Sequence, residues 1–83
     1  MYEIIFTEQA KKQLTALDPA VRQRIGSAIE RIKIRPHSFI KRLYNSKYYR
    51  LRVDNYRLIL DIHDNQLIVY IIEIGHRDHI YKN

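Results

Sequence analysis

The chain has 83 residues, 46% of them hydrophobic and 29% charged, with a net charge of +6 and no cysteine. This length accommodates a single domain over residues 1–83, and the lack of cysteine excludes disulfides and thiolate metal sites. The positive charge favours a polyanionic partner such as nucleic acid, an anionic membrane surface or an acidic protein. The apolar run Leu67–Ile72 is too short to span a membrane, so we expect a soluble, cytoplasmic protein.

The first half of the chain predicts a strand and two helices. Residues Tyr2–Phe6 are rich in aromatic and β-branched side chains, which is typical of a short strand. Thr7 is a candidate N-cap for a helix whose apolar face consists of Ala10, Leu14 and Leu17. Asp18 followed by Pro19 is a start signal for a second helix, which we expect to end near Ile34. The apolar stripe of this helix consists of Val21, Ile25, Ala28, Ile29 and Ile32.

The second half predicts a basic connection and three strands. Residues Pro36–Lys47 are expected to be irregular because Pro36 ends the helical pattern. Two short turns of hairpin type separate the strands, which are expected at Tyr48–Val53, Tyr56–His63 and Leu67–Ile74. This order of elements predicts an α+β fold, in which an antiparallel helix pair covers one face of a mostly antiparallel four-stranded sheet. The place of the first strand in that sheet stays open.

The register of the first hairpin predicts a cluster of arginines. If its turn is a two-residue loop, Arg52 lies opposite Arg57, and strand alternation places Arg50 on the same face. Like charges in opposed positions destabilise a sheet, so the arrangement favours a bound anion, and guanidinium groups suit phosphate oxygens. The alternative is a solvated face on which Asp61 or Glu73 neutralises part of the charge.

A second polar cluster follows the last predicted strand. It consists of His76, Arg77, His79 and Tyr81. Their polar atoms must stay hydrated or paired, so their gathering in a small domain indicates an anion-handling site. The pair His76 and His79 lacks a convincing third ligand, and we expect no metal site. His37 and His63 are expected to be surface residues without polar partners.

Four short motifs support a family assignment. They are Tyr49-Arg50-Leu51-Arg52, Tyr56-Arg57-Leu58-Ile59-Leu60, Ile74-Gly75-His76-Arg77 and Tyr81. In this order, after one strand and two helices, they resemble the RelE side of the RelE/ParE toxin superfamily over nearly the whole chain. The resemblance implies a type II toxin that enters the ribosomal A site and cuts mRNA without a metal or other cofactor. It also implies a cognate antitoxin, expected as an acidic, largely helical segment in a hetero-oligomer, besides mRNA and rRNA.

The resemblance further implies roles for the matching residues. Arg57 and Arg77 match arginines that stabilise the scissile phosphate, and Tyr81 matches a terminal catalytic tyrosine. Arg50 and Arg52 match lysines that bind RNA or assist proton transfer in relatives, although an arginine is a poorer proton shuttle because it stays protonated. The full set of expected RNA-binding residues is Lys41, Arg42, Lys47, Arg50, Arg52 and His79.

Metal-free RNA cleavage requires a base for the ribose 2′-OH, cations for the phosphate and an acid for the departing 5′ oxygen. The product would be a 2′,3′-cyclic phosphate. The candidate bases are Tyr81, His76 and His79, and we expect Tyr81 to be the base and His76 the acid or an orienting group. The alternative function is a ParE-like DNA gyrase inhibitor, or a toxin-fold binding module without catalysis. ParE-like chains generally lack the terminal arginine and tyrosine.

Overall fold

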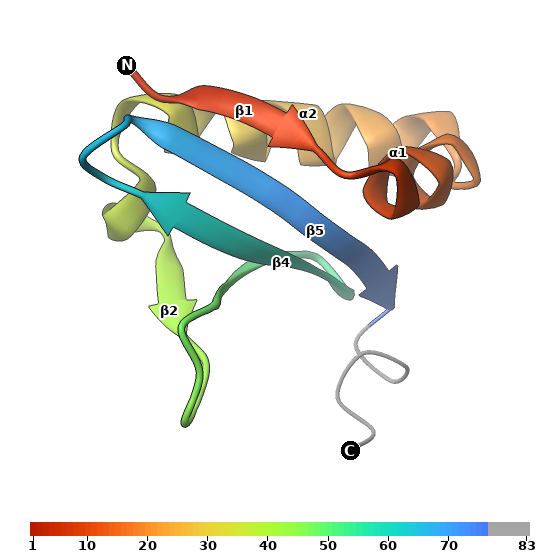
Figure 1. Cartoon of the computed structure of the whole chain (residues 1–83). Helices are drawn as coiled ribbons and strands as arrows, with labels where there is room; N and C mark the ends of the chain where they lie inside the picture. Colours follow the sequence, from red (N-terminus) through yellow and green to blue (C-terminus); the bar gives the residue numbers. More distant parts are fainter. Residues whose placement is uncertain (77–83) are drawn as a thin grey trace.

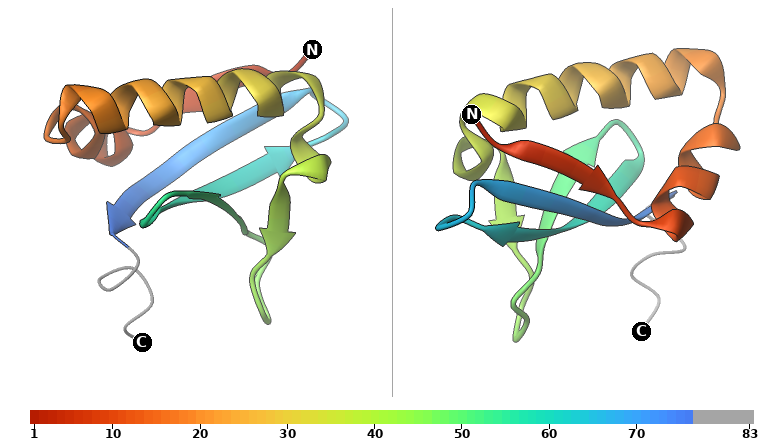
Figure 2. Two further views of the ribbon diagram at one scale, coloured as in Figure 1. Left: turned by 180° about the vertical axis from the view of Figure 1, so that it is seen from behind. Right: turned by 45° about the horizontal axis from the view of Figure 1, so that its top comes forward.

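The computed structural model describes residues 1–76, which form two layers. The elements are β1 (Glu3–Phe6), α1 (Glu8–Thr15), α2 (Pro19–Ile34), the 3-10 helix η1 (Pro36–Ser38), β2 (Ile40–Arg42), β3 (Tyr49–Val53), β4 (Tyr56–His63) and β5 (Ile68–His76). Both α-helices lie on one side of a twisted sheet, and the other side is left uncovered by them (Figures 1 and 2). The predicted α+β class with an antiparallel helix pair is therefore confirmed. No helix within residues 1–76 is long and apolar enough to cross a membrane.

The sheet has five strands in the order β1-β5-β4-β3-β2. The predicted meander of β3, β4 and β5 is antiparallel, and β1 joins it beside β5 in parallel orientation. The fifth strand, β2, lies in the segment 36–47 that was expected to be irregular, so the predicted strand count was wrong. This strand is only three residues long and depends on pairing with β3, so no local pattern identifies it. The strand β5 also continues two residues beyond the predicted end, through Gly75 and His76.

The helix ends follow the predicted signals. Thr7 caps α1, and its Oγ1 accepts a hydrogen bond from the backbone N–H of Ala10 at 3.1 Å. The same hydroxyl donates to the carbonyl of Ile72 at 2.8 Å, beside the irregularity in the pairing of β4 with β5. The amide oxygen of Gln13 accepts from the backbone N–H of Ile74 at 2.6 Å. Side chains of α1 and its cap thus satisfy two backbone groups of β5 and fix the helix on the sheet.

The hydrophobic core fills the space between the helices and the sheet. Its fully buried large side chains are Ile25, Ile32, Leu58, Leu60, Val69 and Ile71. The predicted apolar faces of both helices point into this core, with Leu14, Leu17 and Val21 packed at its margin. The predicted core face of the first hairpin is also confirmed, because Leu51 and Val53 are buried. Strand alternation then forces the intervening side chains onto the opposite face of the sheet.

Candidate phosphate-binding face

Four cationic side chains lie together on the sheet face opposite the helices. The register predicted for the first hairpin is confirmed: Arg52 lies opposite Arg57 across β3 and β4. Arg50 is two residues from Arg52 and shares its face, and Lys41 of β2 is the cross-strand partner of Arg50. We call Lys41, Arg50, Arg52 and Arg57 the cation quartet. Two like-charged pairs thus lie side by side, an arrangement that costs stability unless an anion occupies it.

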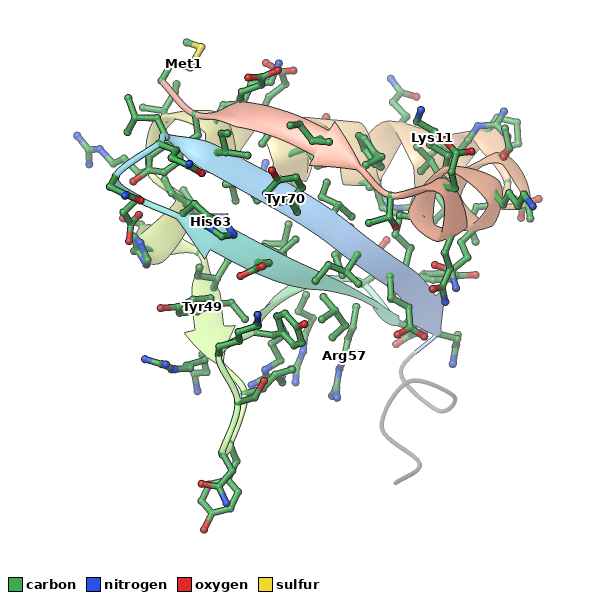
Figure 3. The ribbon with its side chains drawn as sticks, in the orientation of Figure 1. Met1, Lys11, Tyr49, Arg57, His63 and Tyr70 are labelled. Atoms are coloured by element: carbon green, nitrogen blue, oxygen red, sulfur yellow. The ribbon has the colours of Figure 1, made fainter. Side chains whose placement is uncertain are left out.

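The quartet borders a shallow hollow. A pocket of about 220 Å³ is lined by Phe39, Lys41, Arg50 and Arg52. Arg57 is half-buried and projects away from the helices beside this region (Figure 3). Phe39 is 46% exposed and adds an apolar surface to the charged wall. Sequence analysis did not single out Phe39, because its position became clear only once β2 was seen to pair with β3.

The acidic residues of this face do not neutralise it. Asp61 is engaged by His63, whose Nε2 lies 3.1 Å from its carboxylate, and Glu73 lies across β5 from Ile59. Within residues 1–76, neither carboxylate forms an ion pair with Arg50 or Arg52. The alternative of a partly neutralised arginine face therefore finds no support from these two carboxylates at Arg50 or Arg52.

Other predicted RNA-binding residues lie around the hairpin that joins β2 and β3. Arg42 pairs with Tyr49 and so faces away from the quartet, with its guanidinium 5.8 Å from the Tyr49 ring centre. The ammonium group of Lys47 lies 5.3 Å from the ring centre of Tyr48. These residues extend the positive charge beyond the quartet without entering it.

His76 is the one predicted acid–base residue that the structure describes. It ends β5 opposite Tyr56, and the two rings meet edge to face at 5.5 Å. Because Gly75 is the partner of Arg57, alternation places His76 on the opposite side of the sheet from the quartet. The remaining predicted site residues, Arg77, His79 and Tyr81, lie outside the described residues.

A separate polar cluster joins three distant segments. Asp64, in the turn between β4 and β5, accepts a hydrogen bond from the Tyr2 hydroxyl at 2.7 Å and contacts His37 Nε2 at 2.8 Å. These bonds, that of Tyr2 first, lower the pKa of Asp64, while the bond to Asp64 raises the pKa of Tyr2. The expectation that His37 and His63 lack polar partners was wrong, since their carboxylate partners are visible only in the folded chain.

The Asp64 contacts predict an acid-dependent contribution to stability. A carboxyl group whose pKa is lower in the folded than in the unfolded chain adds stability at neutral pH, and that stability is lost as pH falls below 3.8 toward the folded value. The side chain is 57% exposed, so the effect is small. We expect Asp64→Asn to lower the melting temperature slightly at pH 7 and less at pH 3. Thermal melts of both proteins at both pH values test this, and an equal loss at pH 3 would contradict it.

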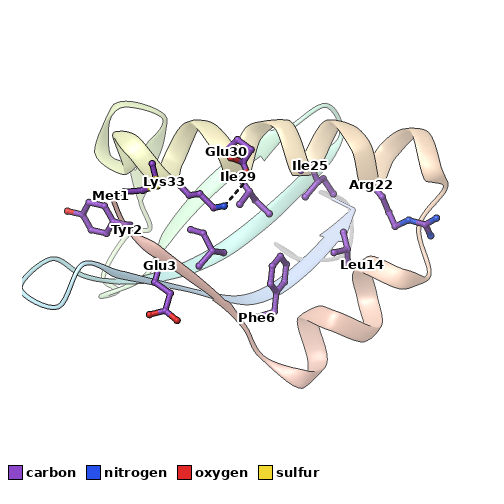
Figure 4. Close-up of a pocket in the computed structure, with 12 residues that line it drawn as sticks. Met1, Tyr2, Glu3, Phe6, Leu14, Arg22, Ile25, Ile29, Glu30 and Lys33 are labelled. Carbon is purple, nitrogen blue, oxygen red and sulfur yellow. Dashed lines mark hydrogen bonds and ion pairs between the residues drawn. The ribbon is translucent and has the colours of Figure 1, made fainter.

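A larger hollow lies on the helix side of the molecule. It measures about 490 Å³ and lies between β1 and α2, with Phe6, Leu14 and Ile25 among its apolar walls (Figure 4). Glu30 and Lys33 form an ion pair of 3.0 Å at its rim. Its apolar walls and mixed rim charges set it apart from the cationic face on the other side of the sheet.

Comparison with known proteins assigns the family. The family model described as the ParE toxin of the type II toxin–antitoxin system parDE matches residues 4–81. An Escherichia coli protein named as a RelE-like toxin is 29% identical over 80 residues, which is 93% of this chain and 84% of the relative.

Solved structures agree with this assignment. The RelBE2 toxin–antitoxin complex of Mycobacterium tuberculosis contains a chain with 26% identity and a TM-score of 0.81, with 92% of this chain and 98% of that chain covered. The intact E. coli RelBE complex gives 25% identity and a TM-score of 0.79, with coverages of 92% and 96%. The RelE–RelB complex of Pyrococcus horikoshii, at 21% identity and a TM-score of 0.80, shares the fold over 94% and 97% of the two chains. The chain therefore belongs to the ParE toxin family of type II toxin–antitoxin systems, as a RelE-like toxin of the RelE/ParE superfamily.

Proposed function

We propose that this toxin is a metal-free endoribonuclease that cuts mRNA in the ribosomal A site and so inhibits translation. The observation that carries the proposal is the cation quartet. Its two opposed pairs are unfavourable for the empty sheet and favourable for a phosphate, whose oxygens accept several charge-assisted hydrogen bonds. The cytoplasm, where mRNA is translated, is the proposed location.

The proposed reaction is a transfer within the RNA. A base removes the proton of the ribose 2′-OH, the resulting oxygen attacks the adjacent phosphorus, and the 5′ oxygen leaves with a proton from an acid. Arg57, with Arg52 beside it, is proposed to stabilise the charge that builds on the phosphate oxygens. The roles of Arg77 as a second stabiliser, Tyr81 as the base and His76 as the acid or orienting group rest on the family resemblance.

We also propose a cognate antitoxin as the partner. The E. coli and M. tuberculosis structures that match this chain are toxin–antitoxin complexes. The net charge of +6 suits an acidic, largely helical antitoxin segment that becomes ordered on the toxin surface. Neutralisation of the quartet by such a segment would block RNA binding.

The deciding experiment is to map mRNA 5′ ends on translating ribosomes incubated with the toxin, in the presence and absence of EDTA-treated protein stocks as a metal control. The proposal predicts discrete cuts at the A-site codon, 2′,3′-cyclic phosphate on the upstream fragment and equal activity of both protein stocks. Active ribosomes that show no cuts would overturn it.

A second function is favoured by the family description. The matching family model is that of the ParE toxin of parDE, and the resemblance associates ParE-like chains with inhibition of DNA gyrase. In that case the quartet would contact protein or DNA and perform no chemistry. Inhibition of gyrase supercoiling, together with unbroken mRNA on the ribosome, would establish this alternative.

A further inference from the structure

The hairpin that joins β2 and β3 projects away from the sheet (Figure 1). Near its tip, Tyr44 is 93% exposed, so both faces of its ring meet solvent. A tyrosine ring contributes a large apolar surface that is usually at least partly covered in a folded protein. The exposure of Tyr44 therefore needs an explanation that the core does not supply.

The hairpin tip has a defined shape. The backbone N–H of Leu43 donates to the carbonyl of Tyr48 at 2.9 Å. The Nε of Arg42 donates to the carbonyl of Ser46 at 3.0 Å, and the Ser46 hydroxyl accepts from the backbone N–H of Tyr48 at 3.0 Å. Asn45 has a φ of 54°, a left-handed conformation that suits the sharp reversal of the chain. Tyr44 is thus displayed by an ordered turn with several internal bonds.

The charge around the tip has one sign. Residues 36–53 include five lysines and arginines and no acidic residue. Cations and aromatic rings are paired on the hairpin, with Arg42 over Tyr49 and Lys47 over Tyr48. The base of the hairpin carries Lys41 opposite Arg50, so its charge is continuous with the cation quartet.

We propose that Tyr44 stacks on an unpaired base of RNA, while Arg42 and Lys47 contact the neighbouring phosphates. The inference rests on the proposed function, because it adds a second RNA contact outside the cation quartet. Aromatic rings that alternate with cations match the alternating bases and phosphates of a nucleic-acid strand. An acidic peptide would satisfy the cations but would give the two exposed faces of Tyr44 no partner, so the observations favour RNA.

Binding to three labelled RNAs tests the inference: a single strand, a duplex with one bulged nucleotide and an uninterrupted duplex of equal length. We expect Tyr44→Ala to weaken binding of the first two by roughly five- to a hundredfold and to leave the duplex unaffected. Tyr44→Phe should bind like the wild type, and Tyr44→Leu should behave like the alanine variant. Lys47→Gln should weaken all three and reduce the salt dependence by about one unit of slope.

The outcomes separate this inference from the proposed function. Equal loss on all three RNAs, or no loss with Tyr44→Ala, would overturn the stacking role even if the wild type cuts mRNA on ribosomes. Loss of affinity for an acidic helical peptide, with RNA binding intact, would overturn it in favour of a protein partner. A wild type that neither binds nor cuts RNA would overturn the proposed function itself. Because Tyr44 is 93% exposed, these variants should fold normally, which circular dichroism checks.

Discussion

Arg57→Ala should reduce the rate of mRNA cleavage by about 100- to 1000-fold, the loss typical of a removed group that stabilises transition-state charge. The melting temperature should change little. Removal of one of two opposed arginines relieves the repulsion by Arg52, which offsets the packing lost with the half-buried side chain. Single-turnover cleavage on programmed ribosomes and a thermal melt measure the two quantities separately.

Two further variants make the Arg57 result specific. Lys12→Ala removes the same charge from an exposed position on α1, the helix side of the molecule, and should leave the cleavage rate unchanged. Arg57→Lys keeps the charge but loses the planar fork, so its rate should lie between those of the wild type and Arg57→Ala. If Lys12→Ala and Arg57→Ala lower the rate equally, net charge and not the quartet controls cleavage.

Leu58→Ala should destabilise the toxin by about 3 kcal/mol, because a fully buried leucine is replaced in a close-packed core. Leu58 lies in β4 between Leu51 of β3 and Ile74 of β5, so the cavity would form where three strands meet. For a domain of this size the melting temperature should fall by about 10–20 °C. Urea unfolding at equilibrium measures the change in the free energy of unfolding.

The matched control for Leu58 is Leu67→Ala, which deletes the same atoms from a side chain that is 47% exposed. Its effect should be well below that of Leu58→Ala, since water already reaches much of the side chain. A loss under about 1 kcal/mol for Leu58→Ala would show that the core collapses around the deleted atoms. Similar losses for the two variants would contradict the burial argument.

Local patterns predicted much of the fold. Thr7 and Asp18 mark the two helix starts, and the alternation around the turn at 54–55 predicted that Arg52 faces Arg57. These features depend on neighbours in the sequence, where capping, helical period and two-residue loops act directly. The location of the cationic face followed from that one register.

Other features depend on partners far away along the chain. The strand β2 and the parallel placement of β1 arise from pairing with β3 and β5, which no local pattern encodes. The contact of His37 with Asp64 joins residues 27 positions apart. The exposure of Tyr44 also required the structure, because tyrosines in the sequence do not reveal which ring the core covers. The roles of Arg77, His79 and Tyr81 stay predictions.

The pairing of β1 with β5 has a consequence for the order of folding. Thr7 and Ile72, which bond at this junction, are 65 residues apart, so their approach carries a large loop-closure entropy. The hairpins of β3, β4 and β5 close much shorter loops and should form first. Pulse-labelled hydrogen exchange during refolding should therefore protect β4 amides before those of β1. A newly made chain would carry the quartet arginines on a formed meander before the sheet is complete.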